Sequence, residues 1–248
     1  SCAFLLASKY GVSAGDRVAL LAQNCPEVFV IQAACARLRA ILLPLNWRLA
    51  IPELDYMMDD ATPKVIFADK KFLKTSNTIA QKQPDCTAIA IGENTEFKEI
   101  LNKLERLEGI PEPKHSDIWH ILYTSGTTGR PKGAMLSHGQ NYLQAVGLGS
   151  EYGITHSSVG LTYTPTFHAS GLFMFANPSL LVGGTTILMR QFDALQSLNM
   201  LTDRSIGITH TLAIPTNLLM IRNLPEFENE HFNGPVSYTH LRAHETDS

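Results

Sequence analysis

The sequence predicts an α/β protein whose sheets are mainly parallel and are covered by helices on both faces. Three observations support this prediction. Short apolar runs alternate with longer helical patterns along the 248 residues. The apolar runs are continuous rather than alternately polar and apolar, which is typical of strands that are buried on both faces. Neither an internal repeat nor a low-complexity linker interrupts this order. The alternation therefore favours strand–helix–strand units layered around sheets.

The expected strands are the short β-rich runs at residues 17–22, 41–45, 64–68, 86–91, 118–124, 133–136, 159–164, 185–190 and 208–214. Helical patterns fill most of the intervals, at residues 26–39, 52–60, 94–108, 139–150, 169–182 and 192–205. Asn24 and Pro26 mark the start of the first of these helices, and Pro52 marks the second. The chain opens inside a further helix, which we expect Gly11 to end.

The most informative segment joins two expected strands and reads Tyr-Thr-Ser-Gly-Thr-Thr-Gly-Arg-Pro-Lys-Gly over residues 123–133. Gly126 and Gly129 permit positive φ angles and a close backbone approach to an anion. Lys132 adds a compact cation. The hydroxyl donors, which bring no negative charge, are Thr124, Ser125, Thr127 and Thr128. The alternative is a polar hairpin turn, but the clustered hydroxyls, paired glycines and Pro-Lys-Gly ending favour a loop that holds a polyphosphate.

This loop differs from the Walker A motif, which ends in Gly-Lys-Ser/Thr. Here Pro131 precedes Lys132, and Gly133 follows it where a magnesium-binding hydroxyl would be needed. A standard P-loop nucleotidase is therefore disfavoured.

Composition excludes several classes of function. The 20 basic and 23 acidic residues are mixed along the chain and give a net charge of −3, so no nucleic-acid-binding face is expected. The four cysteines lack the CxxC spacing of zinc or redox sites. We expect them to be reduced, packed thiols, as in a cytoplasmic enzyme.

Residues 169–189 contain no charged side chain and match a membrane-spanning helix in length. Polar and helix-breaking residues interrupt the stretch, notably Pro178, Gly183 and Gly184. We therefore predict a packed helix, a turn and a strand, and no membrane span.

Residues 123–133 resemble the phosphate-binding signature of the adenylate-forming (AMP-binding) superfamily, and three further segments agree with that resemblance in the family's order. Gly15–Ala19 with Asn24–Glu27 is similar to an early strand and helix start. Pro44–Leu49 with Glu53-Leu54 looks like the acyl-CoA synthetase form of the next turn. Pro165–Gly171 resembles the segment that lines the acyl pocket. The resemblance, closest to the acyl-CoA synthetases, covers roughly residues 1–225.

The resemblance implies ATP-dependent activation of a carboxylic acid, expected to be a fatty acid, to an acyl-adenylate and then to acyl-CoA. ATP, Mg²⁺ and coenzyme A would take part, and the small acid and coenzyme A would be the partners. The resemblance implies catalytic roles for Lys132 and His168, with His168 beside the acyl group. It also implies that phosphates contact Lys132 and the loop residues Thr124, Ser125, Gly126, Thr127, Thr128 and Gly129. No residue is expected to ligate a metal. The segment from Ile208-Thr209-His210 to Pro215-Thr216 resembles a strand and loop behind the acyl pocket.

The resemblance further implies two sheet-and-helix subdomains of the family's large domain, truncated before its β-barrel and its mobile C-terminal domain. The first would span residues 1–155, including the phosphate loop 123–133, and a partial second, with the acyl-pocket segment, residues 156–235. Residues 236–248 resemble a translated adaptor and are expected to be a non-native tail. His240 and His244 lie four residues apart there, without a third ligand in view.

Three alternatives stay open at this level. The chain is an N-terminal fragment of a ligase, expected to be inactive by itself; or it is a nucleotide-binding or inert piece that catalyses nothing; or it derives from an adenylation domain of a peptide synthetase. A luciferase-like oxygenase is the least favoured. The sequence identifies neither the acid nor the oligomeric state.

Overall fold

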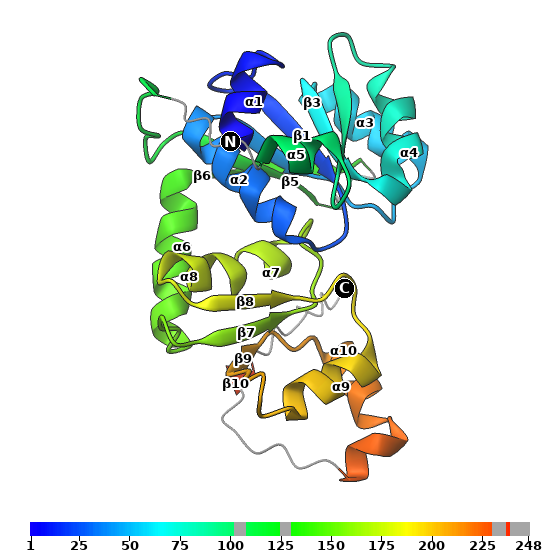
Figure 1. Cartoon of the computed structure of the whole chain (residues 1–248), viewed down its shortest axis with the longest axis vertical. Coiled ribbons are helices and arrows are strands. Elements are labelled where there is room, and N and C mark those ends of the chain that lie inside the picture. The colour runs from blue at the N-terminus through cyan, green and yellow to red at the C-terminus, as the bar shows by residue number, and fades with distance from the viewer. Residues whose placement is uncertain (102–107, 125–129, 230–236, 239–248) are drawn as a thin grey trace, which may run out of the picture. The chain divides into compact units, whose positions relative to one another are not determined.

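The structure is a computed structural model that describes residues 1–101, 108–124, 130–229 and 237–238. The chain divides into two compact units (Figure 1). The first contains Ser1–Leu143 and the short segment Thr166–His168, and the second contains Gln144–Pro165 and the rest of the chain from Ala169 onward. The domain limits at residues 155 and 235 stay predictions. The mixed α/β class predicted from the sequence is confirmed.

The first unit is built on a six-stranded sheet with the strand order β4-β3-β1-β2-β5-β6. Strands β1 to β5 pair in parallel, and β6 runs antiparallel to β5. All five residues of β3 are buried, as expected for a strand that is covered on both faces. The strands are β1 (Arg17–Leu21), β2 (Ile41–Pro44), β3 (Val65–Asp69), β4 (Thr87–Ile91), β5 (Ile118–Thr124) and β6 (Lys132–Ser137).

Helices cover this sheet (Figure 1). They are α1 (Cys2–Ser8), α2 (Pro26–Leu38), α3 (Ile51–Ala61), the 3₁₀ turn η1 (Lys70–Phe72), α4 (Leu73–Ala80) and α5 (Glu96–Leu101). Buried residues of α3 and α4 share one core cluster with alternate residues of β1, β2 and β3. The sequence analysis missed α4, whose residues Thr75, Ser76, Asn77 and Thr78 are weak helix formers. Its buried Ile79 and Ala80 show that packing on the sheet stabilises it.

The second unit contains a parallel sheet with the order β10-β9-β7-β8. Its strands are β7 (Val159–Thr162), β8 (Thr185–Leu188), β9 (His210–Thr211) and β10 (Ser237–Tyr238). Its helices are α7 (Ala169–Leu172), α8 (Ala176–Leu181), α9 (Ala194–Thr202), α10 (Pro215–Arg222) and the 3₁₀ turn η2 (Pro225–Asn229). Helix α6 (His138–Glu151) begins in the first unit and ends in the second.

Two helix predictions need correction. The single helix expected at 169–182 is two short helices, α7 and α8. Pro178 explains the break, because it cannot donate a backbone hydrogen bond and clashes with a helical carbonyl four residues earlier. Helix α10 was not predicted, although Pro215 stands at its start, where proline is favoured. Strand β10 was also unexpected, because no strand was predicted after residue 214.

None of the helices in the described residues has the length and apolar character needed to cross a membrane. The four cysteines are free, and three of them are buried. Burial raises the pKa of the Cys25 thiol to about 12 and that of Cys86 to about 11. These thiols therefore stay protonated and act as packing groups.

Candidate functional site

The hydroxyl- and glycine-rich segment is anchored at both ends by the hairpin of β5 and β6. Thr124, the last residue of β5, pairs directly with Lys132, the first residue of β6. Directly opposed side chains of an antiparallel pair lie on the same face. The hairpin thus places a hydroxyl and an exposed ammonium side by side at the base of the loop. Among the described residues, no carboxylate forms an ion pair with Lys132. The predicted phosphate contacts Ser125, Gly126, Thr127, Thr128 and Gly129 lie outside the described residues.

Helix α3 holds the base of this hairpin through two side chains one turn apart. The Tyr56 hydroxyl donates a hydrogen bond to the Pro131 carbonyl oxygen, 3.2 Å away. The Tyr123 hydroxyl donates to the Asp60 carboxylate. Burial and then this bond raise the pKa of Tyr123, so the phenol remains a donor. Sequence analysis missed both helical residues, since an i, i+4 pair on a helix does not reveal which loop it will meet.

Gly133 is required by packing within the hairpin. A Cβ atom at this position would lie 2.8 Å from Cγ2 of Ile121 and 3.4 Å from Cζ of Tyr123. Glycine therefore allows the Tyr123 ring to lie across β6, in the position from which its hydroxyl reaches Asp60.

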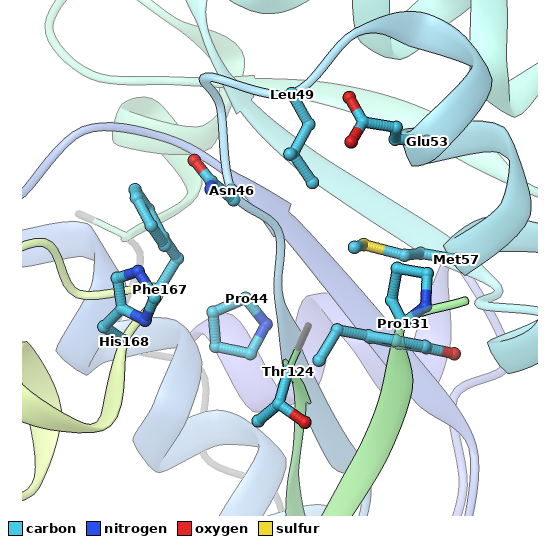
Figure 2. A pocket seen from close by; sticks show the side chains of 10 residues that line it. Pro44, Asn46, Leu49, Glu53, Met57, Thr124, Pro131, Phe167 and His168 are labelled. Atoms are coloured by element: carbon cyan, nitrogen blue, oxygen red, sulfur yellow. The ribbon is translucent and has the colours of Figure 1, made fainter. Parts of the chain in front are cut away.

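A cavity of about 450 Å³ lies beside the hairpin, within the first unit. Its apolar walls come from Pro44, Leu49, Met57, Pro131 and Phe167. Its polar side chains are Asn46, Glu53, Tyr123, Thr124 and His168. Figure 2 shows Phe167 and His168 on one side of the cavity and Glu53 and Met57 on the other. The structure thus brings Thr124 of the predicted phosphate loop and His168 of the predicted acyl-pocket segment to the same cavity.

His168 reaches the cavity on a short segment that packs with the first unit. The buried Phe167 ring lies 4.8 Å from the His168 ring and contacts Trp47 edge to face at 6.3 Å, both between ring centroids. Partial burial, and then the positive charge of Arg48, lower the pKa of His168 below its ordinary value. His168 is therefore a neutral imidazole near pH 7, able to accept or donate one hydrogen bond but not to serve as a fixed cation.

Two cationic side chains, Arg48 and Lys71, lie over the Trp47 ring. The Arg48 guanidinium lies 4.9 Å from the centroid of the Trp47 ring, and the Lys71 ammonium lies 5.3 Å from it. Phe72 stacks on the same indole with a centroid distance of 5.7 Å. Both cations thus lie over an aromatic face, which attracts positive charge electrostatically.

A metal site made only of protein side chains is not present among the described residues. They contain no group of three or more histidine, cysteine, aspartate or glutamate side chains that could hold a metal ion. Glu53 is the carboxylate of the cavity wall, and its Oε2 atom accepts a hydrogen bond from the Ala50 N–H at 2.9 Å.

The predicted strand behind the acyl pocket is organised within the second unit. His210 lies on β9, where Nε2 is 2.9 Å from the Tyr152 carbonyl oxygen and Nδ1 is 2.7 Å from the Thr209 hydroxyl. Its ring lies 5.5 Å from that of Phe175. Both ring nitrogens of His210 thus serve the internal packing of this unit.

The first unit is thus an α/β layered structure in which the β5–β6 hairpin lies beside a cavity of mixed polar and apolar lining. The sequence matches the AMP-binding enzyme family over residues 1–243, and the chain belongs to that family.

Two curated relatives of this chain are named as acid–CoA ligases. The chain is 33% identical over 224 residues to the indoleacetate–CoA ligase of Aromatoleum aromaticum, covering 88% of this chain and 44% of that protein. It is 32% identical to the long-chain-fatty-acid–CoA ligase FadD13 of Mycobacterium tuberculosis, covering 91% of this chain and 44% of that ligase. The crystal structure of ATP-bound MatB from Rhodopseudomonas palustris superposes with a TM-score of 0.80 at 30% identity, covering 90% of this chain and 44% of MatB.

The chain thus spans less than half the length of these relatives. The family match extends beyond the region of resemblance seen in the sequence, which ended near residue 225, and into residues 236–243. The non-native origin expected for residues 236–248 stays a prediction.

Proposed function

We propose that this chain supplies the phosphate-binding hairpin and part of the acid-binding pocket of an AMP-forming acid–CoA ligase. The observation that carries the proposal is the shared cavity. Thr124 at the base of the hydroxyl-rich loop and His168 on the opposite segment line the same space, and Lys132 stands directly across from Thr124. A phosphorylated and an apolar reactant could meet there without crossing the sheet.

In the proposed reaction, a carboxylate attacks the α-phosphorus of ATP, pyrophosphate leaves, and the thiol of coenzyme A then displaces AMP from the acyl group. The part assigned to Lys132 and Thr124 is to hold oxygens of the leaving pyrophosphate, on which negative charge accumulates. Lys132 suits this part because it is exposed and belongs to none of the ion pairs between described residues. Ser125, Thr127 and Thr128 are proposed to add hydroxyl donors, with Gly126 and Gly129 allowing close backbone approach.

His168 is assigned to the acid. A neutral imidazole next to Phe167 does not attract phosphate as a cation would, and it can accept or donate a hydrogen bond beside an apolar body. We propose an acid with a substantial apolar body, in the first instance a fatty acid, because five apolar side chains, among them Leu49, Met57 and Phe167, line the cavity. The names of the relatives, indoleacetate–CoA ligase and long-chain-fatty-acid–CoA ligase, are consistent with either an aromatic or an aliphatic body. A cytoplasmic location fits the free cysteines.

A second candidate function is nucleotide binding without catalysis. It is favoured by one observation, that the chain spans 44% of the length of its ligase relatives. Residues that complete adenylation in those proteins could lie in the part that this chain does not match.

The two candidates are separated by measuring binding and turnover on the same preparation. Binding of MgATP is followed by calorimetry, and ATP–pyrophosphate exchange is measured with hexadecanoate, octanoate, indoleacetate and ferulate, with acetate as the small-acid control. Exchange that depends on one of the apolar acids supports the ligase, and binding without exchange supports the nucleotide-binding module. Absence of MgATP binding would contradict both.

Lys132→Ala tests the hairpin assignment. It should weaken MgATP binding about tenfold or more, because a charge-assisted contact to phosphate contributes well over 1 kcal/mol. Lys74→Ala, which removes an exposed lysine on α4, is the matched control and should bind like the unmodified chain. Equal binding by both variants would remove Lys132 from the phosphate site.

A further inference from the structure

The segment that carries Phe167 and His168 is tied to the first unit by a buried hydrogen bond. The Thr166 backbone N–H donates to Oδ1 of Asn24 across 2.8 Å. Asn24 is 2% exposed and Thr166 is 3% exposed, so water does not compete for this bond. The two residues are 142 positions apart in sequence. A buried backbone N–H needs an acceptor, and the side chain of Asn24 supplies it.

Asn24 is itself held in place from the opposite direction. It stands in the turn between β1 and α2, and the preceding N–H, of Gln23, donates to Oδ2 of Asp69 across 2.8 Å. Asp69 is the last residue of β3, which pairs with β1, and its side chain is buried. The turn is therefore held against the sheet by a hydrogen bond. Asn24, which lies in this turn, holds the Thr166 backbone N–H in place.

The residues that follow Thr166 form one wall of the cavity. Phe167 contacts Trp47 edge to face, and His168 lies on the same wall (Figure 2). Pro165, on the other side of Thr166, restricts its own φ angle. A displacement of the Thr166 backbone would therefore carry Phe167 and His168 with it.

We propose that Asn24 is a positioning residue of the acid site: its side-chain oxygen, bound to the Thr166 N–H, sets where Phe167 and His168 stand on the cavity wall. The consequence for acid binding rests on the function proposed above. Asn24 is not among the residues that line the cavity, and it acts through the backbone of the segment.

The test uses two signals that need no ligand. The chain contains two tryptophans, so Trp119→Phe leaves Trp47 as the single indole reporter beside Phe167. The pKa of His168, followed by NMR against a His168→Gln spectrum, reports its burial and its distance from Arg48. In this background Asn24→Leu removes the acceptor while keeping the number and branching of the side-chain heavy atoms, and Asn24→Asp keeps an oxygen in the same place. Thr95→Ala is the control, because it breaks a buried side-chain hydrogen bond to the Gly92 carbonyl elsewhere in the first unit.

Asn24→Leu should shift Trp47 emission to longer wavelength and raise the pKa of His168 toward its ordinary value. Asn24→Asp should restore most of the Trp47 emission, and Thr95→Ala should change neither signal. Folded Asn24→Leu with the Trp47 emission and His168 pKa of the parent would overturn the proposal. Equal changes of the two signals in Thr95→Ala would also overturn the proposal, because they would show that the signals respond to any loss of stability.

A measurement on the unmodified chain covers the case in which Asn24→Leu does not fold. The Thr166 amide should exchange with D₂O at least a hundredfold more slowly than an exposed loop amide, because its hydrogen bond is buried. Exchange at the rate of a free loop would mean that Asn24 does not hold this segment, and would overturn the proposal.

The functional consequence is measured with octanoate and MgATP as separate probes. Asn24→Leu should weaken octanoate binding about tenfold and leave MgATP binding within twofold, since its bond to the Thr166 N–H acts on the segment that carries Phe167 and His168. Equal loss for both probes would contradict a role confined to the acid site. If the unmodified chain binds neither probe, the proposed function fails, and the Trp47 and Thr166 signals still decide whether Asn24 positions the segment.

Discussion

Tyr56 donates its hydroxyl to the carbonyl oxygen of Pro131, 3.2 Å away, and thereby ties helix α3 to the base of the hydroxyl-rich hairpin. One turn further along the helix, Asp60 accepts from Tyr123 on the neighbouring strand. The two bonds hold β5 and the residue that precedes β6 from the same helix. The loop thus stands on a rigid element at its base, which lowers the conformational cost of ordering it around an anion.

Tyr56→Phe should lower the free energy of unfolding by about 0.5–1.5 kcal/mol, because it removes one hydrogen bond and leaves the ring in place. Urea unfolding measures this change. Tyr142→Phe removes a hydroxyl from a side chain that is about half exposed, at 51%, and should change the unfolding free energy by less than about 0.5 kcal/mol. Equal effects of the two substitutions would mean that the Tyr56–Pro131 bond contributes nothing specific.

Gly160→Ala should destabilise the second unit by about 1–3 kcal/mol through overpacking. A Cβ atom on Gly160 in β7 would lie only 1.7 Å from Cε1 of Phe175, so the ring must move. The double variant Gly160→Ala with Phe175→Leu should recover part of the loss, because the new methyl group then has space. Gly147→Ala in α6 is the opposite case, since nothing lies within 4 Å of its new Cβ atom. Gly147→Ala should stabilise the helix by about 0.5–1 kcal/mol.

Purely additive losses in the double variant Gly160→Ala with Phe175→Leu would contradict the predicted clash between the new methyl group and the Phe175 ring.

Stability should fall as the pH drops from about 6.5 toward 4, because of His120. This side chain on β5 is fully buried, and burial followed by the charge of His138 lowers its pKa to about 3. A histidine whose folded pKa lies below its unfolded pKa of 6.5 binds a proton more readily after unfolding. Its contribution is therefore complete above pH 6.5, and below that pH it is lost at up to about 1.4 kcal/mol per pH unit.

Urea unfolding of the unmodified chain at several pH values between 4 and 7.5 checks the sign and the window. The native-state NMR signal of His120 should not titrate in that range. His120→Leu should flatten the pH dependence if it folds. An unfolding free energy that is the same at pH 5 and pH 7 would contradict the assignment.

Acid sensitivity at lower pH should come from Asp117. The Arg39 guanidinium contacts this carboxylate through Nε at 2.7 Å and through a second nitrogen at 3.2 Å, and it lowers the pKa of Asp117 to about 2. A carboxyl whose folded pKa is lowered stabilises the fold above its unfolded pKa of 3.8, and the contribution is lost as the pH falls toward 2. Asp117→Asn should thus reduce the loss of thermal midpoint between pH 4 and pH 2. Parallel curves for the two proteins would show that the pair does not contribute in this window.

Strands of the first unit could be predicted closely where a continuous apolar run in the sequence marks them. Residues 65–68 are all apolar and all buried, and the predicted strand 64–68 corresponds to β3 at Val65–Asp69. The predicted strand 118–124 has the bounds of β5. A strand that is covered on both faces has no polar position to interrupt the run, so its pattern does not depend on its partner.

Helix positions were predictable where a proline or an amphipathic pattern marks them, as at Pro26 for α2, and less so elsewhere. Helix α4 contains a polar, hydroxyl-rich stretch of weak helix formers. It is helical because Ile79 and Ala80 are buried in the core. The prediction of a single helix at 169–182 was wrong. The stretch contains no charged residue to mark a boundary, but Pro178 divides it into α7 and α8.

The sequence by itself determined the fold class and the family, because these depend on local residue types and short spacings, and the phosphate-binding role of the loop at 123–133 stays a prediction. The tertiary structure decided which distant residues meet: Tyr56 with Pro131, Asn24 with Thr166, and Thr124 with His168 around one cavity. The physical reason is that hydrogen bonds and cavity walls arise from chain segments brought together by burial. A pair 142 residues apart leaves no periodicity or spacing from which its contact could be predicted.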